Sequence, residues 1–346
     1  MAQNTVRVGL VGAGTNTRVM HIPGFQSIDD VEIVSICNRS RESSERVAKE
    51  FGISKVYENW TELVDADDIN AICIGTWPYM HSPITLRALS KGKHVLTEAR
   101  MAMDATESHT MLNSARQHPN LVTQIVPFPF TLKVDKTVIN LITEGYLGNI
   151  LAVELRANQS IFADLTRPMW WRDDRDVSGY NILVMGMWYE ALMRWIGPAT
   201  KVTALTKTAI HQRKDDQGIL RSLSVPDHAD ILCEMACGAQ ARLLFSNILG
   251  LAPKGGIWIF GDQGTLHLDI STMELSGGQR GDESLKPITI PTELEGKWRV
   301  EEEFINAIRG EEKITHTTFE DGVKYMEFTE AVTRSAQSGR AINLPL

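Results

Sequence analysis

The sequence predicts two domains, a doubly wound parallel α/β domain over residues 1–126 and an α+β domain over residues 127–346. Single hydrophobic cores stop growing at about 250–300 residues, and this chain is longer. Residues 6–126 alternate short β-branched runs with helical patterns, which is typical of a parallel sheet covered on both faces. After Gly148, strand patterns follow one another with few helices between them, which favours an open, mostly antiparallel sheet.

The first domain is expected to contain strands separated by helical crossovers. The predicted strands are Val6–Val11, Val31–Cys37, Ala71–Gly75, His94–Thr97 and Leu121–Val126. The predicted helices are Arg18–Ser27, Glu42–Phe51, Trp60–Val64, Ser82–Ser90 and Ala105–Gln117. Crossovers of this length join parallel strands, and strand twist makes them right-handed.

The second domain is expected to contain an open sheet and three longer helices. The predicted strands are Leu151–Ala157, Val202–Lys207, His228–Met235 and Gln240–Asn247. The predicted helices are Ile182–Trp195, Arg299–Arg309 and Phe319–Ser338. Because an open sheet needs its outer face covered, we expect a homodimer or homotetramer. The apolar stretches Ala229–Met235 and Leu243–Leu249 belong either to that covered face or to the core of one subunit.

Composition argues against several classes of protein. The formal net charge is −8 and the basic residues are scattered, so a nucleic-acid partner is not expected. No apolar run approaches the roughly 18 residues that span a bilayer, and the N-terminal sequence does not resemble a signal peptide. The cysteines Cys37, Cys73, Cys233 and Cys237 lack metal or redox spacing, so we expect reduced core thiols, no metal site and a cytoplasmic protein.

The first predicted strand runs directly into a glycine-containing turn, Gly12-Ala13-Gly14-Thr15-Asn16-Thr17. Glycines let the chain turn tightly and let backbone N–H groups approach a pyrophosphate, which a helix N-terminus also attracts. Thr17 stands where a third glycine is usual, so the fingerprint is imperfect. The alternative is a glycine turn in an unrelated α/β domain, but the strand-turn-helix context favours a Rossmann domain that binds a nicotinamide dinucleotide.

The second strand ends in Asn38-Arg39-Ser40-Arg41, without the acidic residue that usually binds the ribose 2′-OH of NAD. Guanidinium groups match phosphate oxygens, so Arg39 and Arg41, with the Ser40 hydroxyl, are suited to the 2′-phosphate of NADP. This pattern favours NADP, with NAD as the alternative. Both arginines are otherwise solvated residues at a helix start.

Several motifs occur together in one order: GAGTNTRVMHIPGF, GTWPYMHSPITLRALSKGKHVLTEARMA, EGYLGNI and SGYNILVMGMWYEALMRWIG. In this order they resemble the Gfo/Idh/MocA family of sugar and polyol oxidoreductases over nearly the whole chain. The resemblance implies a set of cofactor-binding residues: Gly12, Gly14, Thr15, Asn16, Thr17, Asn38, Arg39, Ser40, Arg41, Thr76, Trp77, Pro78, His81, Glu98, Ala99, Arg100, Trp171 and Arg172.

The chain differs from this family at the positions whose side chains usually transfer protons. The Glu-Lys-Pro motif reads Glu98-Ala99-Arg100, so its lysine is missing. If Gly186 aligns with the family glycine, the usual aspartate and histidine read Val184 and Trp188, and a second aspartate reads Ala191. Residues 181, 184, 188 and 191 are expected on one helix face, which then offers no titratable group. Alcohol oxidation needs a group that accepts the hydroxyl proton.

Other side chains are candidates for this missing chemistry. We expect catalytic roles for Arg100, Tyr180 and Asn181, and substrate contacts from Trp170, Arg172, Tyr180 and Trp188. The competing interpretations are an ion pair between Arg100 and Glu98, and ordinary core packing for the aromatic residues. For His21 and His81, a structural role is expected in preference to the role of a catalytic base.

Three functions follow from these patterns. The first is an NAD(P)-dependent oxidoreductase acting on CH–OH groups of a sugar, polyol or sugar acid, with an altered proton relay through Arg100, Tyr180 or bound water. The second is a cofactor-retaining, redox-neutral lyase, epimerase or glycosidase. The third is a non-catalytic dinucleotide-binding sensor or regulator. The expected partner is a small carbohydrate-like substrate, with neither nucleic acid nor a membrane.

Overall fold

The computed structural model describes residues 5–159 and 161–346, so the first four residues and residue 160 of the predicted domains lie outside the described part. By their contacts the residues form two compact units. One comprises the described residues through Pro127 together with Arg299–Val323, and the other comprises Phe128–Trp298 together with Lys324–Leu346. The segment Arg299–Val323, which the sequence assigned to the second domain, therefore groups with the first unit.

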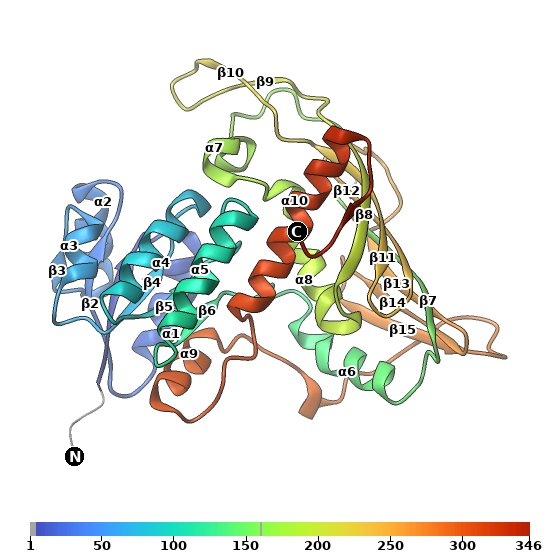
Figure 1. The fold of residues 1–346 in the computed structure, drawn as a ribbon, viewed down its shortest axis with the longest axis horizontal. Coiled ribbons are helices and arrows are strands. Elements are labelled where there is room, and N and C mark those ends of the chain that lie inside the picture. Colours follow the sequence, from blue (N-terminus) through green and yellow to red (C-terminus); the bar gives the residue numbers. More distant parts are fainter. Residues whose placement is uncertain (1–4, 160) are drawn as a thin grey trace. The chain divides into compact units, whose positions relative to one another are not determined.

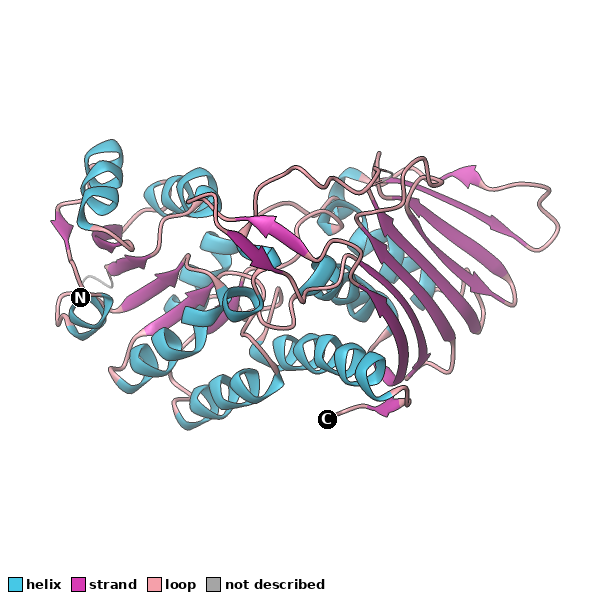
Figure 2. Ribbon diagram, turned by 90° about the horizontal axis from the view of Figure 1, so that it is seen from above, coloured by secondary structure: helices cyan, strands magenta, loops and turns pink. Residues whose placement is uncertain are grey.

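The first unit contains a six-stranded sheet of order β3-β2-β1-β4-β5-β6, in which every pair is parallel. Its strands are β1 Val6–Val11, β2 Val31–Cys37, β3 Lys55–Val56, β4 Ala71–Ile74, β5 His94–Thr97 and β6 Thr123–Ile125. Figure 2 shows helices on both sides of this sheet, which confirms the doubly wound fold. Only the short edge strand β3 was not predicted.

The helices of this unit follow the predicted pattern. They are the π-helical turn Thr17–His21 continuing into α1 Ile22–Gln26, then α2 Arg41–Phe51, α3 Trp60–Asp65, α4 His81–Ser90, α5 Ala105–Gln117 and α9 Val300–Arg309. The central strand β4 is buried along its whole length, as expected for a strand covered on both faces. The chain order reverses beside β1, and such a switch point is where open α/β sheets bind ligands.

The second unit is built on a nine-stranded sheet of order β16-β15-β14-β13-β7-β12-β11-β8-β17. The strands are β7 Ile150–Asn158, β8 Ala199–Lys207, β11 His228–Met235, β12 Gln240–Ser246, β13 Gly256–Gly261, β14 Gly264–Asp269, β15 Glu274–Gln279, β16 Lys286–Pro287 and β17 Ile342–Asn343. All pairs are antiparallel except β7 with β12. The predicted mostly antiparallel sheet is confirmed.

Helices of the second unit lie against one face of this sheet (Figure 2). This unit contains the helices α6 Leu132–Thr143, α7 Arg175–Ser178, α8 Met185–Ile196 and α10 Phe319–Ser338, whose residues from Lys324 onward belong to it (Figure 1). Helix α6 was not predicted from the sequence. A separate antiparallel hairpin, β9 Gln212–Lys214 with β10 Leu220–Ser222, was also not predicted.

The apolar stretches proposed for an intersubunit face mostly fill the core of one chain. In β11 the alternate residues Ala229, Ile231, Cys233 and Met235 are buried, whereas Leu232 is 59% exposed. This alternation is the ordinary two-residue period of a strand with one covered face. In the second stretch, Leu243 and Phe245 are fully buried.

The predicted helix Ile182–Trp195 is interrupted near its start. Ile182–Val184 form a short 3₁₀ turn, in which Leu183 and Val184 have φ values of 52° and 51°. Helix α8 begins only at Met185. Because positive φ values break the helical repeat, residues 181 and 184 do not share a helix face with residues 188 and 191, and that prediction was wrong.

Cysteine burial agrees with the prediction except at one position. Cys37, Cys73 and Cys233 are buried, but Cys237 is exposed, so it is not a core residue. Within residues 5–159 and 161–346, no group of His, Cys, Asp and Glu is arranged to hold a metal ion. No helix in the described part is both long and apolar enough to cross a membrane.

Candidate functional site

The turn after β1 and the turn after β4 approach each other closely. Gly12 has a φ of +86°, and a Cβ there would lie 2.8 Å from both the Gly75 carbonyl carbon and the Thr76 nitrogen. A Cβ on Gly75 would overlap the hydroxyl of Thr17 and the carbonyl of Gly12. Thr17 thus packs where the third glycine of the fingerprint is usual, and Gly75 provides the space that this threonine requires.

Gly14 differs from these two glycines. A Cβ at Gly14 would meet no atom closer than the Gly75 carbonyl oxygen, at 3.8 Å, so the packing of this chain does not require glycine there. Gly14 and its neighbours Thr15 and Asn16 are exposed. The open surface above Gly14 is the region where a backbone N–H cradle receives a pyrophosphate.

Asn38 fastens the end of β2 to the glycine turn. Its side-chain oxygen accepts a hydrogen bond from the Ala13 N–H at 2.7 Å, and its side-chain nitrogen donates to the Ser43 hydroxyl at 3.2 Å. The Asn38 amide therefore positions the cradle, which is a role that sequence position alone did not distinguish from direct cofactor binding.

The residues predicted to bind a 2′-phosphate have different surroundings. Arg41 donates to Glu45 at 2.7 Å and to Glu58, and these hydrogen bonds raise the pKa of Arg41. The Ser40 hydroxyl caps α2 by accepting the Ser43 N–H. Arg39 is exposed, and its guanidinium carbon lies 5.8 Å from the centre of the Trp77 ring. Arg39 and Trp77 thus form a cation-π pair near the cradle.

His81 connects the turns that follow β4 and β5. Its fully buried ring lies with Nδ1 2.9 Å from the Arg100 carbonyl oxygen and Nε2 3.0 Å from the Thr76 carbonyl oxygen. Burial lowers the pKa of His81. Both ring nitrogens are occupied by backbone carbonyls, so His81 positions the two turns.

Glu98 belongs to a buried network of alternating charges. It accepts hydrogen bonds from Asn16, from His21 Nε2 at 3.1 Å and from the Ala99 N–H at 3.2 Å. The other ring nitrogen of His21 binds Glu301, which follows the start of α9. Opposite charges this close favour the ionised forms of His21 and Glu98.

The titration of this network follows from its geometry. Burial by itself would lower the pKa of His21, but hydrogen bonds to Glu301 and Glu98 outweigh it and raise the value to about 9. Burial likewise works against the charge on Glu98, yet the contact with His21 holds the pKa of Glu98 below its ordinary value. His21 is therefore an imidazolium near neutral pH and does not act as a base there.

Arg100 occupies a buried position at the turn after β5, with 2% of its surface exposed. Its backbone carbonyl is bound by His81. A guanidinium stays protonated in proteins, so Arg100 is suited to stabilising an oxyanion and not to accepting a proton.

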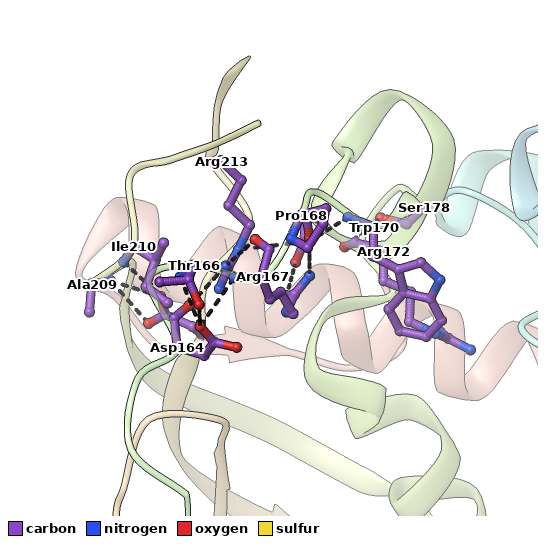
Figure 3. Close-up of polar contacts among 12 residues, drawn as sticks. Asp164, Thr166, Arg167, Pro168, Trp170, Arg172, Ser178, Ala209, Ile210 and Arg213 are labelled. Carbon is purple, nitrogen blue, oxygen red and sulfur yellow. Dashed lines mark hydrogen bonds and ion pairs between the residues drawn. The ribbon is translucent and has the colours of Figure 1, made fainter. Parts of the chain in front are cut away.

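In the second unit, the loop that precedes α7 presents Trp170 and Arg172 (Figure 3), and Trp171 lies between them in the sequence. The two indole rings meet edge to face, with centres 5.5 Å apart. The Arg172 guanidinium carbon lies 5.4 Å from the Trp170 ring and 4.2 Å from the Trp171 ring. Trp170 is 54% exposed. This cluster is an exposed surface of aromatic and cationic character.

The same loop is stabilised by contacts among its own residues and by contacts with the β9–β10 hairpin. Arg167 makes a bidentate ion pair with Asp173, at 2.6 and 2.8 Å, and the Asp173 carboxylate also accepts a hydrogen bond from the Trp170 N–H at 2.8 Å. From β9, the buried Arg213 donates to the backbone carbonyls of Asp164 at 2.8 Å and Arg167 at 3.0 Å (Figure 3). Arg213 lies 49 residues after Asp164 and 46 residues after Arg167, and no sequence pattern indicated these contacts.

The remaining predicted residues lie on either side of the start of α8. Tyr180 is half-buried, and the Arg175 guanidinium carbon lies 4.6 Å from the centre of its ring. Asn181 is buried and donates to the Ser178 carbonyl at 2.7 Å. Trp188 is only 8% exposed and packs edge to face on Phe128, with ring centres 4.7 Å apart. It therefore contributes to the core more than to a surface for substrate.

Tyr189 is a packing residue, as expected. Its ring stacks on Phe328 with centres 3.7 Å apart, and its hydroxyl accepts the Ala199 N–H at 2.7 Å. The buried ring raises the pKa of the Tyr189 phenol further above neutrality. Tyr189 therefore does not supply the missing base.

Comparisons with known proteins agree with this fold. The chain is 26% identical over 300 residues to an uncharacterized oxidoreductase from Synechocystis, covering 83% of this chain and 80% of the relative. It is 26% identical over 252 residues to glucose-6-phosphate 3-dehydrogenase from Bacillus subtilis, covering 70% and 67%. A structure of levoglucosan dehydrogenase in complex with NADH and L-sorbose superimposes with a TM-score of 0.87 at 21% identity, covering 98% of this chain and 99% of that one.

Two family models together match most of the chain. Residues 6–125 match the oxidoreductase family with an NAD-binding Rossmann fold, and residues 136–267 match the Gfo/Idh/MocA C-terminal domain. The first match contains the glycine cradle, and the second contains the loop with the tryptophan pair and helix α8. The chain is an oxidoreductase and belongs to the Gfo/Idh/MocA family.

Proposed function

We propose that this protein is an NADP-dependent oxidoreductase that acts on a CH–OH carbon of a sugar, polyol or sugar acid through a proton relay of its own. The observation that carries this proposal is the cradle at the β1/β4 switch point. Gly14 lies in this cradle, and no neighbouring atom of the chain is close enough to exclude a side chain there. Relatives named as sugar dehydrogenases support the substrate class.

The preference for NADP rests on Arg39. Arg41 is occupied by two carboxylates, so Arg39 is the guanidinium at the end of β2 that is suited to a 2′-phosphate. The Ser40 hydroxyl, which accepts a hydrogen bond as the cap of α2, keeps its own O–H to donate. None of residues 38–41, which directly follow β2, is a carboxylate that could receive the ribose 2′-OH of NAD.

The bound nicotinamide would supply the hydride acceptor, and the chain must handle the proton of the substrate hydroxyl. Ala99, Trp188 and Ala191 have no titratable group, and His21 is held as a cation by Glu98 and Glu301. We assign the proton transfer to the Tyr180 hydroxyl or to a water beside it. Arg100 would stabilise the developing alkoxide, Asn181 would hold the Tyr180 segment, and Trp170 and Arg172 would contact the sugar.

A matched panel of substrates tests this proposal. Purified protein is incubated with NADP⁺ or NAD⁺ and with neutral polyols, aldoses and sugar acids, and reduced nicotinamide is followed by absorbance. We expect turnover with NADP⁺ and at least one panel member, and weaker turnover with NAD⁺. Tight cofactor binding without reduction by any member would contradict the proposal and favour a sensor, whereas product without net reduction would favour a redox-neutral lyase or epimerase.

We also propose that the protein forms a homodimer through the outer face of the nine-stranded sheet. Leu205 and Leu232, on the neighbouring strands β8 and β11, are 74% and 59% exposed. Light scattering of the wild type and of Leu232→Glu tests this: a dimer that becomes a monomer is expected, and an unchanged mass for the variant would contradict this interface.

A further inference from the structure

A pocket of about 180 Å³ lies within the second unit. Its walls come from α7 and the segment after it, from the end of β8, from residues 224–226 and from the C-terminal part of α10. It is smaller than the roughly 300–1,000 Å³ of pockets for drug-sized ligands, so its occupant is small. Tyr180, to which we assign proton transfer, lines it.

The polar lining of this pocket has one sign of charge. Arg175 provides a guanidinium, and hydroxyl groups come from Thr206, Thr208, Ser224 and Thr333. Among the described residues that line the pocket, none is Asp or Glu. A cavity with one cation, several hydroxyls and no carboxylate is complementary to an oxyanion that carries further hydroxyl groups.

Two acidic residues next to this lining are engaged elsewhere. Asp174 caps α7 by accepting the Asp176 N–H at 2.9 Å. Asp227, which follows the lining residue Pro226, accepts the backbone N–H groups of Ala209 at 3.0 Å and Ile210 at 2.9 Å. The Arg175 guanidinium lies instead over the Tyr180 ring, at 4.6 Å from its centre, which holds the guanidinium beside the phenol.

We infer that this pocket binds the carboxylate or phosphate of a small polyhydroxylated acid, with Arg175 as the anion ligand and the threonine and serine hydroxyls as partners for the sugar hydroxyls. A guanidinium fork matches either anion, and charge-assisted hydrogen bonds are about twice as strong as neutral ones. The inference rests on the proposed function in treating this acid as the substrate. It narrows the proposed substrates to sugars that carry an acidic group and excludes neutral polyols.

Isothermal titration of the full chain without turnover tests the pocket separately from catalysis. The probes are gluconate, glucose 6-phosphate, inorganic phosphate and glucose. We expect both sugar anions to bind at least about tenfold more tightly than glucose, which corresponds to one charge-assisted hydrogen bond. Binding of gluconate alone identifies a carboxylate as the anion, and binding of glucose 6-phosphate alone identifies a phosphate.

Variants of the lining residues make the test specific. Arg175→Gln is expected to weaken binding of the sugar anions about tenfold and to leave glucose unaffected. Thr206→Val, which keeps the shape and removes one hydroxyl, is expected to weaken both sugar anions and glucose by a smaller factor. The matched control is Lys207→Gln, which removes an exposed cation on the same strand outside the pocket and should leave the dissociation constants within twofold.

Equal losses in Arg175→Gln and Lys207→Gln would overturn the inference, because they would show a non-specific effect of charge. Undiminished anion binding in Arg175→Gln would also overturn it, as would inorganic phosphate binding as tightly as glucose 6-phosphate. Anion binding that depends on Arg175 without any nicotinamide reduction would support the pocket and refute the oxidoreductase proposal. Turnover of neutral polyols at the same efficiency as their acids would support the oxidoreductase proposal and refute the pocket.

Discussion

The cofactor turns of the first unit and the tryptophan loop of the second unit are fixed in opposite ways. In the first unit the side chains bind one another and neighbouring backbone, as Asn38, His81 and Glu98 do, and the backbone is left as the surface for a ligand. In the second unit the loop backbone is held by Arg213, and the side chains of Trp170 and Arg172 form the surface. A dinucleotide recognised by backbone needs one fixed shape, whereas a surface of side chains can be altered by substitution to suit another substrate.

The largest effect on cofactor binding is expected where the two turns of the first unit meet. Gly75→Ala would place a Cβ against Thr17 and the Gly12 carbonyl, and overpacking of this kind costs about 1–3 kcal/mol. We expect a lower melting temperature together with loss of dinucleotide binding. Gly14→Ala is the matched control, since its Cβ has room: stability should stay within about 0.5 kcal/mol while cofactor affinity falls. Equal destabilisation by the two substitutions would contradict the cradle geometry.

The charged network around His21 predicts a loss of stability at alkaline pH. The pKa of His21 is raised in the folded state to about 9, so its stabilising contribution is fully present below its unfolded pKa of about 6.5 and is lost as pH rises through 9. The pKa difference between 6.5 and about 9, at about 1.4 kcal/mol for each pKa unit, corresponds to a loss of about 3.5 kcal/mol.

Denaturant unfolding of the wild type and of His21→Gln between pH 6 and 9.5 measures this contribution, with about ten points spread over that range. The wild-type unfolding free energy should fall with pH, and the variant should show a flatter curve. Parallel curves for the two proteins would contradict a protonated His21 in the folded state.

In the second unit, Arg213→Met tests whether the hairpin positions the tryptophan loop. Loss of two charge-assisted bonds to the Asp164 and Arg167 carbonyls is expected to cost about 1.5–3 kcal/mol and to raise KM for the sugar more than it lowers kcat. Arg213→Lys should recover part of this effect. Arg221→Met, on the other strand of the hairpin and exposed, is the control and should change neither constant. A purely structural Arg213 would lower the melting temperature and leave KM unchanged.

The smallest effect is expected at the ribose end of the cradle. Arg39→Gln should weaken NADPH about tenfold, the equivalent of one lost charge-assisted contact, and should leave NADH unchanged. Arg41→Gln should change NADPH affinity by less than Arg39→Gln, because its guanidinium is already bound to Glu45 and Glu58. A larger effect from Arg41 would contradict the assignment of the 2′-phosphate to Arg39.

The strands and the cradle could be predicted because their signals are local. Buried β-branched runs and the Gly12 and Gly14 turn lie within a few residues of one another, and the predicted bounds of β1, β2, β5 and β11 coincide with those of the structure. The start of α8 could not be predicted, because Ile182–Trp195 has a helical apolar pattern although Leu183 and Val184 adopt positive φ. Arg213 contacts Asp164 and Arg167, and Arg175 lines a pocket together with residues of β8 and α10. These residues are distant in sequence, and periodicity carries no information about such contacts.

We propose that the cradle holds a nicotinamide and that Tyr180 transfers the proton of the substrate hydroxyl, in place of the usual family residues. The most direct measurement is a single-turnover experiment, in which protein saturated with NADP⁺ is mixed with a panel of sugar acids and polyols and reduced cofactor is followed in time. Our account predicts reduction of bound cofactor by the wild type and a rate about 10²–10⁴-fold lower for Tyr180→Phe, with cofactor binding unchanged. An equal rate in the variant, or bound NADP⁺ that no panel member reduces, would contradict it.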